Sequence, residues 1–251
     1  MKSIAISLAL ASAATARTMT VYNACPFTIW PAYFTSAGGT PNYPTGWAAG
    51  AFSAVTFDIP NDWNGRIWGR RNCDFSNNPG PNSCLDGGCN GGLLCDRATG
   101  TGVPPASLAE FNLGANGGST DYYDVSVVDG YNLPVRIDNT AGCALSECPV
   151  DLGPNCPAEL KGPFDSSGFP VGCKSQCYVD ALNGHPNDNP SCCSGIHDTP
   201  ATCPSSGVGH YSYFKQACPL AYAYAYDDLT SLFTCPTGAQ PSYTVTFCPA
   251  S

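Results

Sequence analysis

Charge is scarce in this chain of 251 residues. Charged residues make up only 12% of it, with 10 lysines and arginines and 19 aspartates and glutamates, and there are 3 histidines besides. The formal net charge at pH 7 is therefore −9. An acidic chain is repelled by the phosphates of nucleic acid and by anionic membrane surfaces. We therefore expect no nucleic acid and no membrane among its partners, which should be neutral or cationic molecules.

Long apolar runs are also missing after the N-terminus. The run "IAISLALASAA" follows Lys2 and is too short to span a bilayer. Ala14-Thr15-Ala16 then matches the small-x-small pattern of a signal-peptidase site. We expect residues 1–16 to be a signal peptide and the mature chain to begin at Arg17. Because Lys2 is then removed, the mature charge falls to −10. The protein should be secreted, and reside outside the cell or in the cell wall.

Histidine is too rare to support zinc binding by the cysteines. The three histidines are His185, His197 and His210, and none lies at finger spacing from a cysteine pair. Sixteen cysteines, an even number, in an exported chain indicate a framework of eight disulfides. The residues alone leave the pairing open, although the adjacent Cys192 and Cys193 should each pair elsewhere. We expect no metal and no cofactor.

What the chain has in abundance is glycine (27) and proline (23). They separate short runs rich in Val, Ile, Thr and aromatic residues, such as "RTMTVYNAC", "FSAVTFDIP", "YYDVSVVDG" and "SYTVTFCP". Short alternating runs between turn residues are typical of a β-sandwich or barrel. Helical periodicity is scarce, and the best helix candidate is residues 173–184, "CKSQCYVDALNG". The sequence therefore predicts a mainly β protein.

The density of cysteine varies along the chain. Four cysteines crowd residues 73–95, nine lie in residues 143–218, and residues 96–142 have none. We expect one domain, residues 17–251, with a central β body and two small lobes that depend on disulfides. The body should comprise about 17–70, 106–142 and 219–251. A cystine loop lobe should span about 71–105, and a helix-containing lobe about 143–218.

Several segments resemble one known family, the thaumatin-like proteins of the pathogenesis-related group 5 type. In family order they are "GRIWGRRNCDF", "CLDGGCNGGLLC", "GVPPASLAEFNL", "DYYDVSVVDGYNLP", "CPAEL", "YSYFKQACPLAYAYAYDD" and "YTVTFCP". The first segment and the acidic charge are most similar to the fungal, glucan-directed branch. The resemblance implies a flattened antiparallel β-sandwich, a middle lobe with a helix, and a small cystine-rich loop lobe.

The resemblance also implies the disulfide pairing. The expected pairs are Cys25–Cys248, Cys73–Cys84, Cys89–Cys95, Cys143–Cys235, Cys148–Cys218, Cys156–Cys173, Cys177–Cys192 and Cys193–Cys203.

Members of this family carry an acidic cleft formed by one arginine, one glutamate and three aspartates. The matching positions are Arg66 of "GRIW", Glu110 of "LAEF", Asp124 of "YYDVS" and Asp129 of "VVDG". At the position of the third aspartate the chain has Leu220. Asp227 and Asp228 are close in sequence, and the residues alone do not indicate whether either one compensates.

The segment at residues 121–130 places three carboxylates among aromatic and β-branched residues. We expect Asp121, at the strand edge, to be exposed or to cap a turn. Two carboxyls in one cleft suit glycoside hydrolysis, in which one donates a proton and the other attacks or activates water. The resemblance suggests Glu110 as general acid and Asp124 as base or nucleophile. Arg66, Asp129, Tyr123 and Phe111 are then the expected substrate-binding residues.

The leading hypothesis is a secreted, monomeric endo-β-1,3-glucanase that acts on fungal cell-wall β-glucan, a neutral polysaccharide. The same cleft could also bind β-glucan without chemistry, as in a non-catalytic antifungal defence protein. A third hypothesis is an inhibitor of another hydrolase. The sequence leaves all three open.

Overall fold

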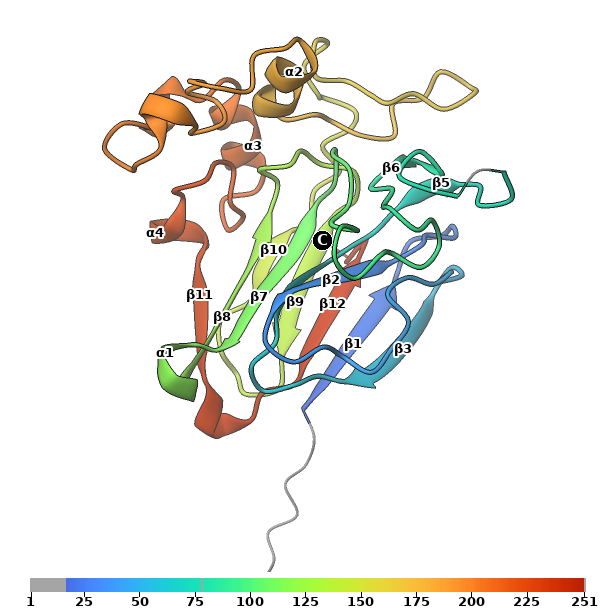
Figure 1. Cartoon of the computed structure of the whole chain (residues 1–251), viewed down its shortest axis with the longest axis vertical. Helices are drawn as coiled ribbons and strands as arrows, with labels where there is room; N and C mark the ends of the chain where they lie inside the picture. The colour runs from blue at the N-terminus through green and yellow to red at the C-terminus, as the bar shows by residue number, and fades with distance from the viewer. Residues whose placement is uncertain (1–16, 78, 251) are drawn as a thin grey trace, which may run out of the picture.

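Two five-stranded sheets packed face to face form the body of the protein (Figure 1). The computed structural model describes residues 17–77 and 79–250; the predicted signal peptide lies outside the described residues. The first sheet has the strand order β10 (Ser146–Cys148), β9 (Val135–Asn139), β12 (Tyr243–Phe247), β1 (Thr18–Asn23), β3 (Ser53–Asp58). The second has the order β11 (Phe233–Pro236), β8 (Thr120–Ser126), β7 (Leu108–Gly114), β4 (Asn64–Trp68), β2 (Ala32–Ala37). The predicted mainly β sandwich is confirmed.

The two ends of the described chain lie side by side in the first sheet. β1 and β12 are parallel, with Val21 opposite Val245, whereas every other strand pair among the described residues is antiparallel. This parallel pair is the one exception to the expected antiparallel arrangement among the described strands. Cys25 and Cys248 lie just beyond the paired strands and are joined by a disulfide.

Alternating side chains of the two sheets form the core between them. Residues of β1 and β8 alternate between buried and partly exposed, because successive side chains of a strand point to opposite faces. Tyr243 of the first sheet packs against Phe111 and Tyr123 of the second, with ring centroids 5.3 Å apart in each pair. This aromatic contact joins the inner faces of the two sheets. The outer face of the second sheet carries the site described below.

All sixteen cysteines lie within the described residues and form eight disulfides. The pairs are those that the resemblance implies: Cys25–Cys248, Cys73–Cys84, Cys89–Cys95, Cys143–Cys235, Cys148–Cys218, Cys156–Cys173, Cys177–Cys192 and Cys193–Cys203.

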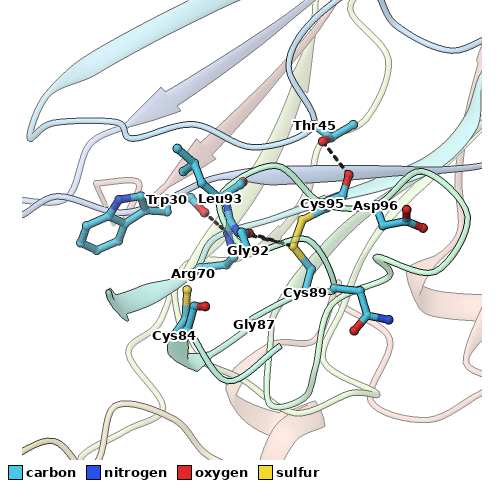
Figure 2. The surroundings of a disulfide bond; sticks show 12 residues. Trp30, Thr45, Arg70, Cys84, Gly87, Cys89, Gly92, Leu93, Cys95 and Asp96 are labelled. Carbon is cyan, nitrogen blue, oxygen red and sulfur yellow. Dashed lines mark hydrogen bonds between the residues drawn. A yellow bond between two sulfur atoms is a disulfide. The ribbon is translucent and has the colours of Figure 1, made fainter. Parts of the chain in front are cut away.

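The cystine loop lobe is built on a two-stranded sheet, β5 (Arg71–Cys73) and β6 (Cys84–Asp86), and is anchored by a buried arginine. Figure 2 shows Arg70 beside the Cys89–Cys95 disulfide. Its guanidinium and Nε donate to the carbonyl oxygens of Gly92 at 2.6 Å, Leu93 at 2.9 Å and Trp30 at 2.8 Å. Burial lowers the pKa of Arg70 to about 10. These carbonyl contacts assign Arg70 a structural role.

The helix-containing lobe lies beyond one end of the sheets (Figure 1). It holds α2 (Gln176–Leu182), α3 (Tyr211–Ala217) and two 3₁₀ turns, Gly195–His197 and Ser205–Gly207. The helix predicted at 173–184 is α2, which begins after Ser175 because that side chain accepts the N–H of Tyr178. α3 was not predicted. The lobe begins later than residue 143, because β10 belongs to the first sheet.

Three short elements complete the chain. α1 (Ala115–Gly118) is a turn between β7 and β8, α4 (Asp228–Ser231) precedes β11, and a 3₁₀ turn spans Thr237–Ala239. No helix within residues 17–77 and 79–250 is long and apolar enough to cross a membrane.

Candidate functional site

Strand register places Arg66, Glu110 and Asp124 in one row across the second sheet. Arg66 of β4 lies opposite Glu110 of β7, and Glu110 lies opposite Asp124 of β8. Residues directly opposite each other have Cβ atoms about 4.5–5.5 Å apart and share a face of the sheet. The structure therefore brings together three residues that are 58 positions apart from first to last, Arg66 to Asp124.

The row lies in a groove on the outer face of the second sheet. One cavity, of about 460 Å³, and another, of about 400 Å³, both include Arg66, Glu110 and Asp124 in their lining. The first, called the neutral arm, is further lined by uncharged residues, among them Ser36, Asn64, Asn112, Asn116, Tyr122 and Leu232. The second, called the acidic arm, adds Ser126, Asp129, Tyr222 and Asp228. Glu110 and Asp124, called the acid pair, thus lie where the two arms meet.

Arg66 reaches the acidic arm through Asp129. Its Nη1 lies 3.7 Å from Asp129 Oδ2, and both side chains are partly exposed. A surface ion pair of this kind contributes little to stability. The ion pair holds the positive charge of Arg66 beside Glu110, on the side of the row away from Asp124.

Burial and neighbouring charges raise the pKa of both carboxyls of the acid pair. For Asp124, burial is the largest cause, and the negative charges of Glu110 and Asp228 raise the pKa further, well above its usual range. Burial also raises the pKa of Glu110; the Arg66 guanidinium opposes the rise, the negative charge of Asp129 adds to it, and the Ser126 hydroxyl lowers the pKa slightly. Two interacting carboxyls of this kind titrate as a pair and can share one proton.

Asp228 is the carboxylate of the groove that sequence reasoning left undecided. It lines the acidic arm, and the Tyr222 hydroxyl donates to its Oδ1 at 2.7 Å. Asp227 is instead buried and holds Lys215, with Nζ at 2.9 Å from its Oδ2. Leu220 lines neither arm. Of the two aspartates near the missing third one, only Asp228 adds a carboxylate to the groove.

Two of the expected substrate-binding aromatics are in the core, which corrects the prediction. Tyr123 is 0% and Phe111 is 3% exposed, and both belong to the cluster between the sheets, although Phe111 also borders the neutral arm. They are paired across β7 and β8, one residue from the acid pair, so their side chains point to the opposite face. On β8, the tyrosine that faces the groove is Tyr122, whose hydroxyl accepts a hydrogen bond from Asn116 Nδ2 at 2.8 Å.

Asp121 is buried, so its expected exposure or turn-capping role at a strand edge is also wrong. It forms an ion pair with Arg17 and accepts hydrogen bonds from the Tyr243 hydroxyl at 2.8 Å and the Gly114 N–H at 2.9 Å. This aspartate supports the sandwich and takes no part in the groove. Within the described residues, no cluster of three or more His, Cys, Asp or Glu side chains is arranged to hold a metal ion.

Comparison with known proteins gives consistent matches. The model of the thaumatin family matches residues 23–249. The chain is 41% identical over 239 residues to pathogenesis-related thaumatin-like protein 3.5 of Cryptomeria japonica, covering 94% of this chain and 91% of the relative. It is 37% identical over 252 residues to a glucan endo-1,3-beta-glucosidase of Prunus avium, covering 98% and 96%. Both are plant proteins, so the fungal branch stays a prediction.

Among solved structures, the fold is similar to that of a laminaripentaose-producing beta-1,3-glucanase in complex with laminaritetraose. The TM-score is 0.56 with 12% identity, covering 93% of this chain and 99% of the other. At that identity the similarity concerns the fold alone.

Proposed function

The chain belongs to the thaumatin family, and from this premise and the acidic groove we propose that it is a secreted, monomeric endo-β-1,3-glucanase acting on fungal cell-wall β-glucan. The observation that carries the proposal is the position of Glu110 opposite Asp124 where the two arms of the groove meet. The relative named a glucan endo-1,3-beta-glucosidase supports the substrate class. Eight disulfides support export to an oxidising environment.

The acid pair supplies the groups that glycoside hydrolysis needs. One carboxyl, kept protonated by its raised pKa, donates to the leaving glycosidic oxygen. The other, ionised, attacks the anomeric carbon or activates a water molecule. Burial favours sharing a single proton between Glu110 and Asp124, so that both forms are present at once.

The open groove supports cleavage within a chain. Because the acid pair has an arm on either side, sugar units can occupy both sides of the scissile bond. The neutral arm offers amide groups of Asn64, Asn112 and Asn116 to sugar hydroxyls and the ring of Tyr122 as an apolar surface. An uncharged glucan suits this lining, because it brings no negative charge to a site that is already acidic.

Release of reducing ends from a soluble linear β-1,3-glucan tests the proposal. We expect turnover by the folded mature protein, and a loss of roughly 100-fold or more in Glu110→Gln and Asp124→Asn with glucan binding retained. Asp58→Asn is the matched control, because Asp58 is an exposed aspartate on β3 of the other sheet.

The alternative is a non-catalytic β-glucan-binding or antifungal defence protein, which the replacement of the third aspartate by Leu220 favours. Wild-type protein that binds insoluble glucan but releases no sugar would replace the glucanase proposal with this one. A protein that does neither, but slows another hydrolase in a mixing assay, would be an inhibitor.

A further inference from the structure

A segment from outside the sheet brings Asp228 to the acid pair. Tyr222 forms a parallel bridge with Ser126 at the end of β8. Its N–H donates to the carbonyl oxygen of Val125 at 2.9 Å, and its own carbonyl oxygen accepts the N–H of Val127 at 2.9 Å. These bonds fix the backbone of Tyr222 beside the end of β8, two residues from Asp124.

The side chain of Tyr222 in turn positions the carboxylate of Asp228. Its side chain is largely buried, at 8% exposed, and its hydroxyl donates to Asp228 Oδ1 at 2.7 Å. Asp228 itself is exposed to the acidic arm, where it begins α4. The phenol therefore defines where the negative charge of Asp228 lies, while the carboxylate remains accessible from the groove.

The charges around the acid pair are distributed unevenly. Arg66 and its partner Asp129 lie on the Glu110 side of the row. Asp228 and Tyr222 lie on the Asp124 side. Lys215, which contacts the same segment at Ala221 and Ser231, is already paired with the buried Asp227. The charges acting on Asp124 are thus negative, whereas at Glu110 the positive charge of Arg66 acts more strongly than the negative charge of Asp129.

We propose that Asp228 is a positioning residue of the groove: held by Tyr222 on the Asp124 side, its negative charge acts with Arg66 on the opposite side to keep the proton of the acid pair on Asp124. Asp228 thereby takes the place of the third cleft aspartate that Leu220 replaces. The proton distribution follows from the arrangement of charges and does not require turnover. Its catalytic consequence rests on the proposed function.

The electrostatic consequences agree with this arrangement. The charge of Asp228 raises the pKa of Asp124, after burial and Glu110, whereas at Glu110 the lowering by Arg66 exceeds the rise that Asp129 causes. Asp124 is then the proton donor to the leaving oxygen, and Glu110 is the ionised partner. This assignment is the reverse of the one that the family resemblance suggests.

Titration of the carboxyl carbons by NMR tests the proposal without reference to activity. Protein labelled with ¹³C at Asp Cγ and Glu Cδ is titrated, and the signals of the acid pair are assigned by their loss in Asp124→Asn and Glu110→Gln. In wild type we expect Asp124 to titrate at higher pH than Glu110. In Asp228→Asn its midpoint should fall by roughly 0.5 to 1 pH unit. Tyr222→Phe, which keeps the carboxylate but frees it, should give a smaller fall.

Asp58→Asn, the same charge change on the other sheet, is the control and should leave the midpoint in place. The proposal is overturned if Asp228→Asn shifts Asp124 no more than this control, or if Glu110 is the carboxyl that titrates at higher pH. A protein without glucanase activity in which Asp228→Asn still lowers the Asp124 midpoint would refute the proposed function and leave this inference standing.

Turnover, where present, gives a second readout. Because Asp124 must stay protonated to donate, the high-pH limb of kcat/KM should move to lower pH in Asp228→Asn, while the low-pH limb stays in place. Movement of the low-pH limb alone would place the proton on Glu110 and overturn the inference. A purely structural role for Asp228 would lower activity without moving either limb.

Discussion

Asp121 and Asp124 lie three residues apart on β8 and face opposite sides of the second sheet. Asp121 is buried against Arg17 and Tyr243 in the sandwich, whereas Asp124 faces the groove beside Glu110. Asp129, in the loop that follows, meets Arg66 in the acidic arm. Asp121 and Asp124 therefore differ in role because a strand presents alternate residues to opposite faces, whereas Asp129 is placed by the turn that follows the strand.

Asp121→Asn should strongly destabilise the fold without changing the groove. The substitution keeps the shape but leaves the buried Arg17 without its counter-ion, and breaking a buried pair costs about 3–5 kcal/mol. Chemical denaturation gives the free energy of unfolding. Replacing Arg17 and Asp121 together by apolar residues should recover part of the loss. If the single and double variants are both as stable as wild type, the pair does not support the sandwich.

Tyr122 and Tyr123 should respond to substitution in opposite ways, although they are adjacent. Tyr123→Ala removes a fully buried ring and should cost about 3–5 kcal/mol of unfolding free energy. Tyr122→Ala should change that free energy by about 1 kcal/mol or less. It should nevertheless weaken binding to β-1,3-glucan by roughly tenfold, as measured by calorimetry. Unchanged affinity in Tyr122→Ala would remove the neutral arm from the binding site.

Arg66→Gln should move the low-pH limb of glucanase activity to higher pH. Arg66 opposes the rise that burial imposes on the pKa of Glu110, so removal of its charge raises that pKa further. Glu110 is then ionised only at higher pH, and the limb should shift upward by roughly 0.5 to 1 unit. Arg136→Gln, on β9 of the other sheet, is the matched control. A limb that stays in place would contradict the proposed influence of Arg66.

Asp86 should make stability depend on pH. Burial raises its pKa from 3.8 to about 7, and its Oδ2 has no hydrogen-bond partner among the described residues. The folded state therefore binds a proton that the unfolded state has lost, so stability falls as pH rises from about 4 to 7. Asp86→Asn should reduce this fall, which is on the order of a few kcal/mol. Thermal unfolding between pH 4 and 7 measures this dependence. If stability falls equally with pH in wild type and Asp86→Asn, Asp86 is not its cause.

The disulfide near the two chain ends should contribute more to the free energy of unfolding than the disulfide that closes the shortest loop. Cys25–Cys248 closes a separation of 223 residues and Cys89–Cys95 a separation of 6. In the entropic model, loss of the first costs about 5 kcal/mol and loss of the second about 2. The other crosslinks shorten the longer loop and reduce the difference. Denaturation of the two double Cys→Ala variants compares them, and a larger loss for Cys89–Cys95 would point to the Arg70 contacts instead.

Strand alternation in the sequence was sufficient to predict that the rings of Phe111 and Tyr123 point away from the groove. Phe111 and Tyr123 each follow or precede a groove carboxylate by one residue, so a strand must turn them to the other face. The resemblance supplied the acid positions, but it did not indicate which neighbours share their face. The burial of Asp121 was harder to predict from the sequence, because its partner Arg17 is 104 residues away in the chain.

By itself the sequence determined the family, the β architecture, the disulfide pairs and the residues of the acid row, because these follow from local patterns and matched motifs. Only the tertiary structure decided between Asp227 and Asp228. Adjacent in sequence, they are separated by the turn into α4, which buries one against Lys215 and exposes the other to the groove. The environment of a carboxyl, and hence its protonation, is set by contacts between distant segments, which no local pattern records.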